Sequence, residues 1–202
     1  MIVYVETNFI LELAYVRPTS DNCQNLLNLA RAKRITLVVP AFSLVEARLA
    51  WQRSVRRRNR LHAEVRTELG ELSRSRPLTN IAAQSQAFVA ALIDTAQQDR
   101  ARLERAIEDT SDVGTVLSTQ TAVVHRAFEI EQSLGLSPQD SLVYATVLDH
   151  AKSLESEPKV FVTQNANDFR IPTVEDELAH YNCKLLVAFD TAEAYVRSTN
   201  RS

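Results

Sequence analysis

The chain opens with the stretch that decides its fold, Met1-Ile-Val-Tyr-Val-Glu-Thr-Asn-Phe-Ile-Leu-Glu12. Residues 2–5 are apolar and mostly β-branched, which predicts a short strand that is buried on both faces. The polar residues 6–8 end this strand, and apolar side chains then recur at helical spacing from Phe9. In an open α/β sheet, ligands bind beyond the carboxyl ends of the strands, so the Glu6 carboxylate is well placed for chemistry. The plainer interpretation is that Asn8 caps the helix and that Glu6 interacts with its positive end.

Composition limits the class of protein. A chain of 202 residues that is 45% apolar suits one domain with a sizeable core. The formal charge of −2 gives no global signal for nucleic-acid binding, and three glycines exclude a glycine-rich phosphate loop. The two cysteines lack CxxC spacing, which indicates ordinary thiols of a reducing compartment. Without a signal-peptide pattern or an apolar run near the roughly 20 residues that span a bilayer, we expect a soluble, cytoplasmic protein with no membrane partner.

Apolar runs predict three further strands, at residues 35–39, 159–163 and 184–188. Helices are expected over residues 20–33, 119–134 and 174–181, and two more should begin at about 138 and 191. Residues 109–114 are expected to form a loop. Strands that alternate with helices at this spacing indicate right-handed units with parallel strands. The expected fold class is α/β, a Rossmann-like three-layer sandwich around a mainly parallel sheet of about four to five strands.

Residues 51–115 differ from the rest of the chain, because two apolar stripes at helical spacing flank a break at 75–77. We interpret this segment as a basic helical hairpin inserted into a single domain that spans residues 1–202. One face of its first helix carries four arginines at i, i+3, i+4 and i+7, namely Arg53, Arg56, Arg57 and Arg60. The chain has nineteen arginines and four lysines, and arginine suits bidentate phosphate contacts. The face therefore either binds a phosphate backbone or is a solvated surface that meets water or an acidic partner.

Acidic residues occur at equivalent places in the predicted topology. Glu6 and Glu46 follow the first two strands, Asp140 begins a helix near the sheet, and Asp168 follows the third strand. Each has a plain explanation as well: Ser43 and Glu46 fit a capping box, and Asp140 suits a helix start. Clustered carboxylates repel one another unless cations lie between them, and Mg²⁺ or Mn²⁺ binds through such oxygens. Two ions of this kind can activate a water and stabilise the leaving oxygen of a phosphodiester.

Taken together, residues 3–13, 39–46, 136–145 and 160–169 resemble the PIN domain family, nucleases that include the toxins of many toxin–antitoxin pairs. The resemblance implies an Mg²⁺- or Mn²⁺-dependent endoribonuclease. The implied metal ligands and catalytic acids are Glu6, Glu46 and Asp140, with support from Asn8 and Thr163. It further implies RNA as substrate, and an antitoxin and a homodimer as protein partners.

Two positions depart from the family pattern. Glu6 stands where the family usually has Asp, and Asn165 stands near a position that is often Asp. Either Asp168 supplies the missing charge, with Asn165 orienting a metal or its waters, or the site uses three acids. These departures leave open a scaffold that binds RNA or a protein without cleaving, and a toxin held inactive by its antitoxin is a further alternative. A carboxylate-rich phosphatase fits less well, because that chemistry needs an aspartyl nucleophile where this chain has Glu6.

Overall fold

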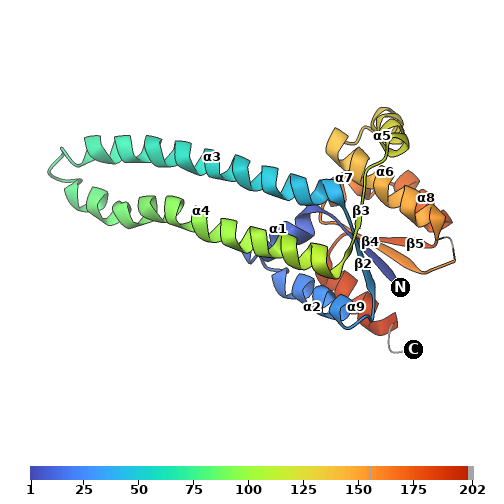
Figure 1. Ribbon diagram of the computed structural model, residues 1–202. Helices are drawn as coiled ribbons and strands as arrows, with labels where there is room; N and C mark the ends of the chain where they lie inside the picture. The colour runs from blue at the N-terminus through green and yellow to red at the C-terminus, as the bar shows by residue number, and fades with distance from the viewer. Residues whose placement is uncertain (155, 200–202) are drawn as a thin grey trace.

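The computed structural model describes residues 1–154 and 156–199, and in them five parallel strands form one sheet in the order β3-β2-β1-β4-β5 (Figure 1). The strands are β1 (Ile2–Val5), β2 (Thr36–Pro40), β3 (Thr115–Leu117), β4 (Lys159–Val162) and β5 (Cys183–Leu186). This arrangement confirms the α/β fold class. The sequence analysis missed β3, a partly exposed edge strand of three residues, because so short a run carries no periodic signal.

Strand β1 is the centre of the sheet, and all four of its residues are buried. Val3 and Val5 belong to a core on one face, whereas Ile2 and Tyr4 belong to a core on the other. Helices α2 (Ser20–Arg31) and α9 (Phe189–Thr199) cover the first face, as Figure 1 shows. The second face is covered by α5 (Thr121–Leu134), α6 (Pro138–Ser153) and α8 (Pro172–His180). The molecule therefore has the three expected layers. Within the described helices, none combines the length and the apolar composition that crossing a bilayer requires.

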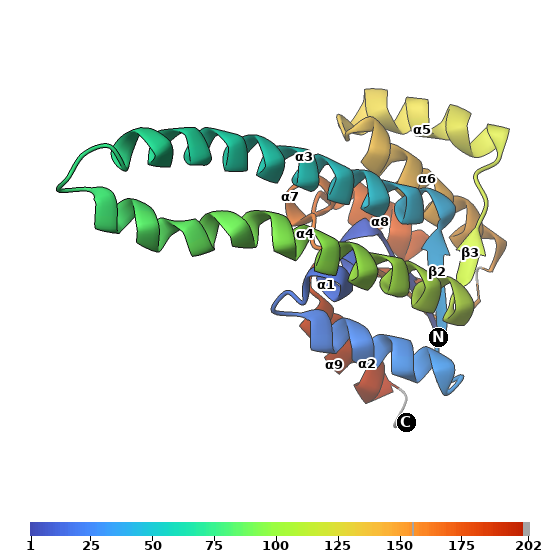
Figure 2. The same cartoon turned by 60° about the vertical axis from the view of Figure 1, so that its left-hand side comes forward.

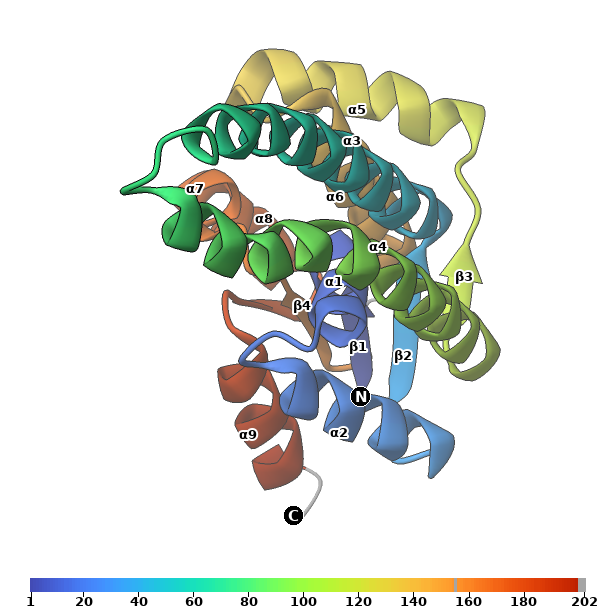
Figure 3. The ribbon, with the colours of Figure 1, turned by 90° about the vertical axis from the view of Figure 1, so that its left-hand side faces the viewer.

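Helices α3 (Ala41–Leu72) and α4 (Thr79–Val113) lie side by side and project well beyond the sheet (Figures 1 and 2). Their inner ends pack on the short helix α1 (Thr7–Tyr15), which Figure 3 shows beneath them. Helix α3 begins directly after Pro40, ten residues before the segment that we interpreted as the hairpin. The long helices thus start at the edge of the sheet where β2 ends.

Two expectations for these helices are wrong. Ser43 does not cap α3, because the helix begins at Ala41 and the Ser43 hydroxyl is buried inside its first turn. Residues 109–113 are helical and not a loop. The hydroxyls of Thr110 and Ser111 donate to the carbonyls of Ala106 and Ile107, each at 2.7 Å, so these polar side chains are satisfied without ending the helix.

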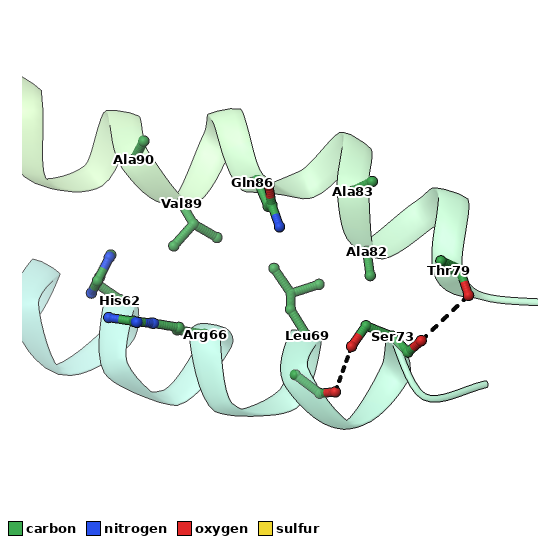
Figure 4. A pocket seen from close by; sticks show the side chains of 11 residues that line it. His62, Arg66, Leu69, Ser73, Thr79, Ala82, Ala83, Gln86, Val89 and Ala90 are labelled. Atoms are coloured by element: carbon green, nitrogen blue, oxygen red, sulfur yellow. Dashed lines mark hydrogen bonds between the residues drawn. The ribbon is translucent and has the colours of Figure 1, made fainter. Parts of the chain in front are cut away.

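The outer half of the hairpin is loosely packed. Leu69 of α3 and Val89 of α4 point between the helices, but the alanines around Val89 fill little volume (Figure 4). A hollow of about 510 Å³ remains there, and Ile81 and Phe88 are largely exposed to solvent. Contacts with the rest of the protein are therefore confined to the inner half of the hairpin.

Gly114 joins α4 to β3 at a place where a side chain does not fit. A Cβ atom at this position would lie 2.8 Å from the Thr110 carbonyl oxygen and 3.3 Å from that of Leu37. We expect Gly114→Ala to lower the free energy of unfolding by about 2 kcal/mol through overpacking. The matched control is Gly70→Ala, which meets open space within α3 and should leave stability unchanged or raise it by up to about 1 kcal/mol. Urea unfolding of the two variants checks this, and equal stabilities would contradict it.

Candidate functional site

The site lies where β1, β2 and β4 end, and Glu6 is at its centre. The register of the sheet pairs Val5 with Val162, so Glu6 and Thr163 leave adjacent strands at the same level. Glu6 adopts extended backbone geometry and is itself the cap of α1, because its Oε2 accepts a hydrogen bond of 2.8 Å from the Asn8 amide. The expectation that Asn8 is the cap is therefore wrong. Asn8 lies in the first turn of α1, and its backbone amide donates to the side chain of Glu6, two residues earlier.

The Glu6 carboxyl group is almost completely buried, with 6% of the residue exposed. Its Oε1 is shielded from solvent and, in the described part of the chain, has no hydrogen-bond partner of good geometry. Burial raises the pKa of Glu6 from 4.5 to about 7, and the Asn8 amide and the Thr163 hydroxyl only partly oppose this shift. A buried oxygen without a partner is costly unless a proton or a cation binds to it.

Glu46 is joined to this corner by Thr7. Helix α3 places Glu46 in its second turn, half-buried, and the Thr7 hydroxyl donates a hydrogen bond of 2.5 Å to its Oε2. Thr7 is adjacent to Glu6 in the chain, so a single residue links two of the predicted acids. The sequence analysis missed Thr7. Its position between Glu6 and Asn8, at the end of a buried strand, was the available signal.

Asp140 is joined to the same corner from the other side. Ser137 caps α6 as expected: its Oγ accepts from the Asp140 amide at 3.1 Å and donates to Asp140 Oδ2 at 2.6 Å. The Asn165 side-chain amide approaches Asp140 Oδ1 at 3.4 Å, and the Asn165 backbone amide donates to Thr163 Oγ1 at 2.9 Å. Asn165 and Thr163 thus connect Asp140 to Glu6.

Asp168 is less closely connected. It lies in the single-turn helix α7 (Ala166–Phe169), which follows Asn165, and it is partly exposed. Within residues 1–154 and 156–199, its carboxylate makes no hydrogen bond or ion pair with another side chain. The assignment of a catalytic role to Asp168 stays a prediction.

The donor set fits a hard divalent cation. Glu6, Glu46 and Asp140 present carboxylate oxygens from three adjoining elements, and Glu6 Oε1 makes no hydrogen bond of good geometry within residues 1–154 and 156–199. In the described part of the chain, no three His, Cys, Asp or Glu side chains are already grouped closely enough to hold a metal ion. The hydrogen bonds of Thr7 and Asn165 instead hold Glu46 and Asp140 beside the Glu6 corner. Binding a cation there therefore requires these two side chains to turn toward Glu6.

A buried carboxylate that the sequence analysis missed supports the edge of this site. Glu12, 3% exposed, accepts hydrogen bonds from the Thr19 hydroxyl at 2.6 Å and amide at 3.2 Å. Thr19 Oγ1 in turn accepts from the side chain of Gln164, at 2.9 Å, and Gln164 directly follows Thr163. Glu12 thus holds the turn between α1 and α2 against the end of β4. Its spacing of four residues from Asn8, on the same side of α1, was a usable signal.

The four predicted RNA-binding arginines, Arg53, Arg56, Arg57 and Arg60, are all exposed on α3. Their neighbour Arg58 has a different environment, because its guanidinium donates to Asp99 of α4 at 2.6 Å. In the part of the chain that the structure describes, none of the four exposed arginines forms an ion pair with the protein's own acids. Their charges are therefore available to a ligand.

Comparisons with known proteins show which family this chain is similar to. A model of the PIN domain family matches residues 3–169, a range that contains all the acids described above. No curated protein matches the chain. One solved structure that matches is VapBC2 from Rickettsia felis bound to a DNA fragment from their promoter, with 17% sequence identity and a TM-score of 0.47. That match covers 92% of this chain and 98% of the other.

Proposed function

The chain belongs to the PIN domain family, and on this premise we propose that it is a metal-dependent endoribonuclease that hydrolyses RNA phosphodiesters. The observation that carries the proposal is the buried Glu6 carboxyl group at the point where three strands end, whose Oε1 makes no hydrogen bond of good geometry with the described residues. Glu46 and Asp140 are held beside it through Thr7 and Asn165. Capping of α1 uses only Oε2 of Glu6, and the second oxygen, buried and incompletely paired, destabilises the fold.

Glu6, Glu46 and Asp140 are the residues that would hold Mg²⁺ or Mn²⁺. When bound, such an ion lowers the pKa of water and stabilises developing charge on phosphate oxygens. The protein's own part is to position these acids: Thr7 orients Glu46, and Ser137 with Asn165 orients Asp140. The Asn8 amide donates to Glu6 Oε2, so that Oε1 is the oxygen not used in capping α1. The exposed arginines of α3 attract the RNA backbone toward this edge.

Cleavage of a mixed single-stranded RNA pool tests the proposal. We expect cutting with Mg²⁺ or Mn²⁺ that stops with chelator and falls to the chelator level in Asp140→Asn. The matched control is Asp149→Asn, which replaces an exposed aspartate at the other end of α6 and should cleave like the wild type. If Asp140→Asn cleaves as well as the wild type, the site assignment is wrong.

A scaffold that binds RNA without cleaving it is the second candidate. Asn165 is neutral where the family often carries an acid, and Asp168 is not connected to the other carboxylates by hydrogen bonds. The same assay separates the two: retention of RNA by the wild type without metal-dependent cutting supports the scaffold. Restoring the acid with Asn165→Asp should then create or increase cleavage.

An antitoxin and a second copy of this chain are the protein partners that we propose. The family includes toxins of toxin–antitoxin pairs, and that membership is the support for both. Light scattering of the purified chain tests the homodimer. Co-expression with the product of an adjacent small reading frame, followed by loss of RNA cleavage, tests the antitoxin.

A further inference from the structure

A small hollow lies where the inner part of α3 passes the end of α1. It has a volume of about 270 Å³ and is lined by three arginines, Arg17, Arg53 and Arg57, together with Leu11, Tyr15, Ala50 and Ser54. Arg17 comes from the turn after α1, whereas Arg53 and Arg57 come from α3. Three guanidinium groups around one hollow repel one another, so the arrangement favours an anion between them.

The hollow also has hydrogen-bond donors that the protein does not satisfy. Among the residues that the structure describes, the Tyr15 hydroxyl is shielded from solvent and makes no hydrogen bond of good geometry, although the Ser54 side chain lies near it. Burial raises the pKa of Tyr15, so the group keeps its proton and remains a donor. The Arg17 guanidinium lies over the Tyr15 ring, 5.0 Å from its centre, and its ion pair with Glu12 is long, at 3.6 Å. A phosphate or carboxylate in the hollow would satisfy both the charges and the hydroxyl.

The hollow is next to the predicted active site. Glu46, Arg53 and Arg57 lie on one side of α3, because their spacings of seven and four residues follow the helical repeat. With a rise of 1.5 Å per residue, Arg53 is about 10 Å and Arg57 about 16 Å along the helix from Glu46. On the α1 side, hydrogen bonds run from Gln164 through Thr19 to Glu12, the ion-pair partner of Arg17. A strand bound at the acids can therefore reach the hollow within a few nucleotides.

We propose that this hollow binds a backbone phosphate of the RNA substrate, a few nucleotides from the bond that is cut. The inference rests on the proposed function, because it takes the RNA strand to lie at the acids. It divides the exposed arginine face: Arg53 and Arg57 act together with Arg17 in one built subsite, whereas Arg56 and Arg60 do not line the hollow. A phosphate fits better than an isolated carboxylate, because its several oxygens can accept from more than one arginine and from Tyr15.

Binding of a fluorescent single-stranded RNA in chelator tests this subsite without cleavage. For Arg53→Ala plus Arg57→Ala we expect about tenfold weaker binding, since charge-assisted contacts with phosphate are lost. The slope of log K against log salt should become shallower by about 0.7, which corresponds to the loss of one phosphate contact on a single strand. The matched control is Arg74→Ala plus Arg76→Ala, which removes the same charge from exposed positions near the hairpin turn. It should weaken binding less than twofold.

The variant Tyr15→Phe tests the hydroxyl separately. We expect about threefold weaker RNA binding and little loss of thermal stability, because among the described residues the hydroxyl makes no hydrogen bond of good geometry. Equal losses of RNA affinity in the two double variants would mean that the arginines attract RNA diffusely, and would overturn the subsite. Unchanged RNA binding in Arg53→Ala plus Arg57→Ala would overturn it as well. An acidic peptide serves as the competitor. If an excess of the peptide does not displace the RNA, the result supports a phosphate site. If the protein binds the peptide in preference to RNA, the result overturns it.

The outcome is independent of whether the chain cuts RNA. Weaker binding in Arg53→Ala plus Arg57→Ala, measured in chelator, supports the subsite even if the wild type shows no cleavage with metal. In that case only the nuclease proposal fails. Conversely, metal-dependent cleavage with unchanged RNA affinity in this variant overturns the subsite and leaves the nuclease proposal intact.

Discussion

Glu6→Gln is expected to make the metal-free protein about 3 kcal/mol more stable at pH 8 while abolishing RNA cleavage. The buried carboxyl group has a pKa of about 7 in the folded protein, against its ordinary value of 4.5. A shift of that size disfavours the charged form by about 3 kcal/mol, at 1.36 kcal/mol per unit. Glutamine has nearly the same shape and carries no charge, so it avoids this cost. It also removes the anionic oxygen on which the proposed metal binding depends.

Because the pKa of Glu6 is raised in the folded protein, the stability gained by Glu6→Gln should depend on pH. Below pH 4.5 both folded and unfolded chains carry a protonated Glu6, so the group costs nothing. As the pH rises from 4.5 to about 7, the unfolded chain loses this proton while the folded chain keeps it, and stability falls. Above about pH 7 both forms are ionised and the cost is complete. The advantage of Glu6→Gln should therefore be small at pH 4.5 and full at pH 8.

Urea unfolding in chelator at pH 4.5 and pH 8 measures this difference. Glu64→Gln, at an exposed position of α3, is the control and should change stability little at either pH. An equal gain at both pH values would show that the effect comes from packing and not from ionisation. Added Mn²⁺ should raise the thermal stability of the wild type at pH 8 and should not raise that of Glu6→Gln.

Asp99→Ala is expected to lower the free energy of unfolding by about 3 kcal/mol, because it leaves two arginines without their shared partner. Asp99 is 5% exposed, and its two oxygens accept from Arg58 at 2.6 Å and from Arg102 at 2.7 Å. Arg102 also donates to the carbonyl oxygen of Ala14 at 3.0 Å. Asp99 thus links α3 and α4 to the end of α1, which carries the site.

The comparison variant is Asp94→Ala, an exposed aspartate on the same helix, which should change stability by less than about 0.5 kcal/mol. Guanidinium unfolding followed by circular dichroism reports both. A loss below about 1 kcal/mol for Asp99→Ala would mean that solvent screens this ion-pair group despite its burial. Because Arg58 is adjacent to Arg57, we also expect Asp99→Ala to weaken RNA binding through displacement of α3.

Much of the fold was predictable because local signals agreed with the global arrangement. The apolar runs that form β1, β2, β4 and β5 are bounded by polar corners, and Ser137 with Pro138 marks the start of α6 unambiguously. The signals failed where polar residues were placed inside helices. Ser43 was predicted to be a helix cap and Thr110 to lie in a loop. Both residues are instead helical and buried among neighbouring elements.

The sequence predicted where the candidate site lies, but it did not predict the hydrogen bonds that hold its side chains. Parallel strands bring Glu6, Glu46 and Asp140 to one edge, which follows from topology alone. Thr7, which holds Glu46, and Glu12, which supports the turn beside Gln164, were missed because their partners are distant in the sequence. In the same way, the basic run of α3 does not reveal that Arg58 is paired, since its partner Asp99 lies 41 residues further along.

By itself, the sequence determined the α/β class, the parallel strands, the family and the sheet edge of the predicted acids, because each depends on short local patterns and on their order along the chain. Only the tertiary structure decided how buried Glu6 is, which oxygen of it lacks a partner, and which arginines of α3 face the hollow beside Tyr15. Those properties depend on how α1, α3 and β4 exclude water from one another. Desolvation is a property of the packed molecule, so no local pattern in the chain encodes it.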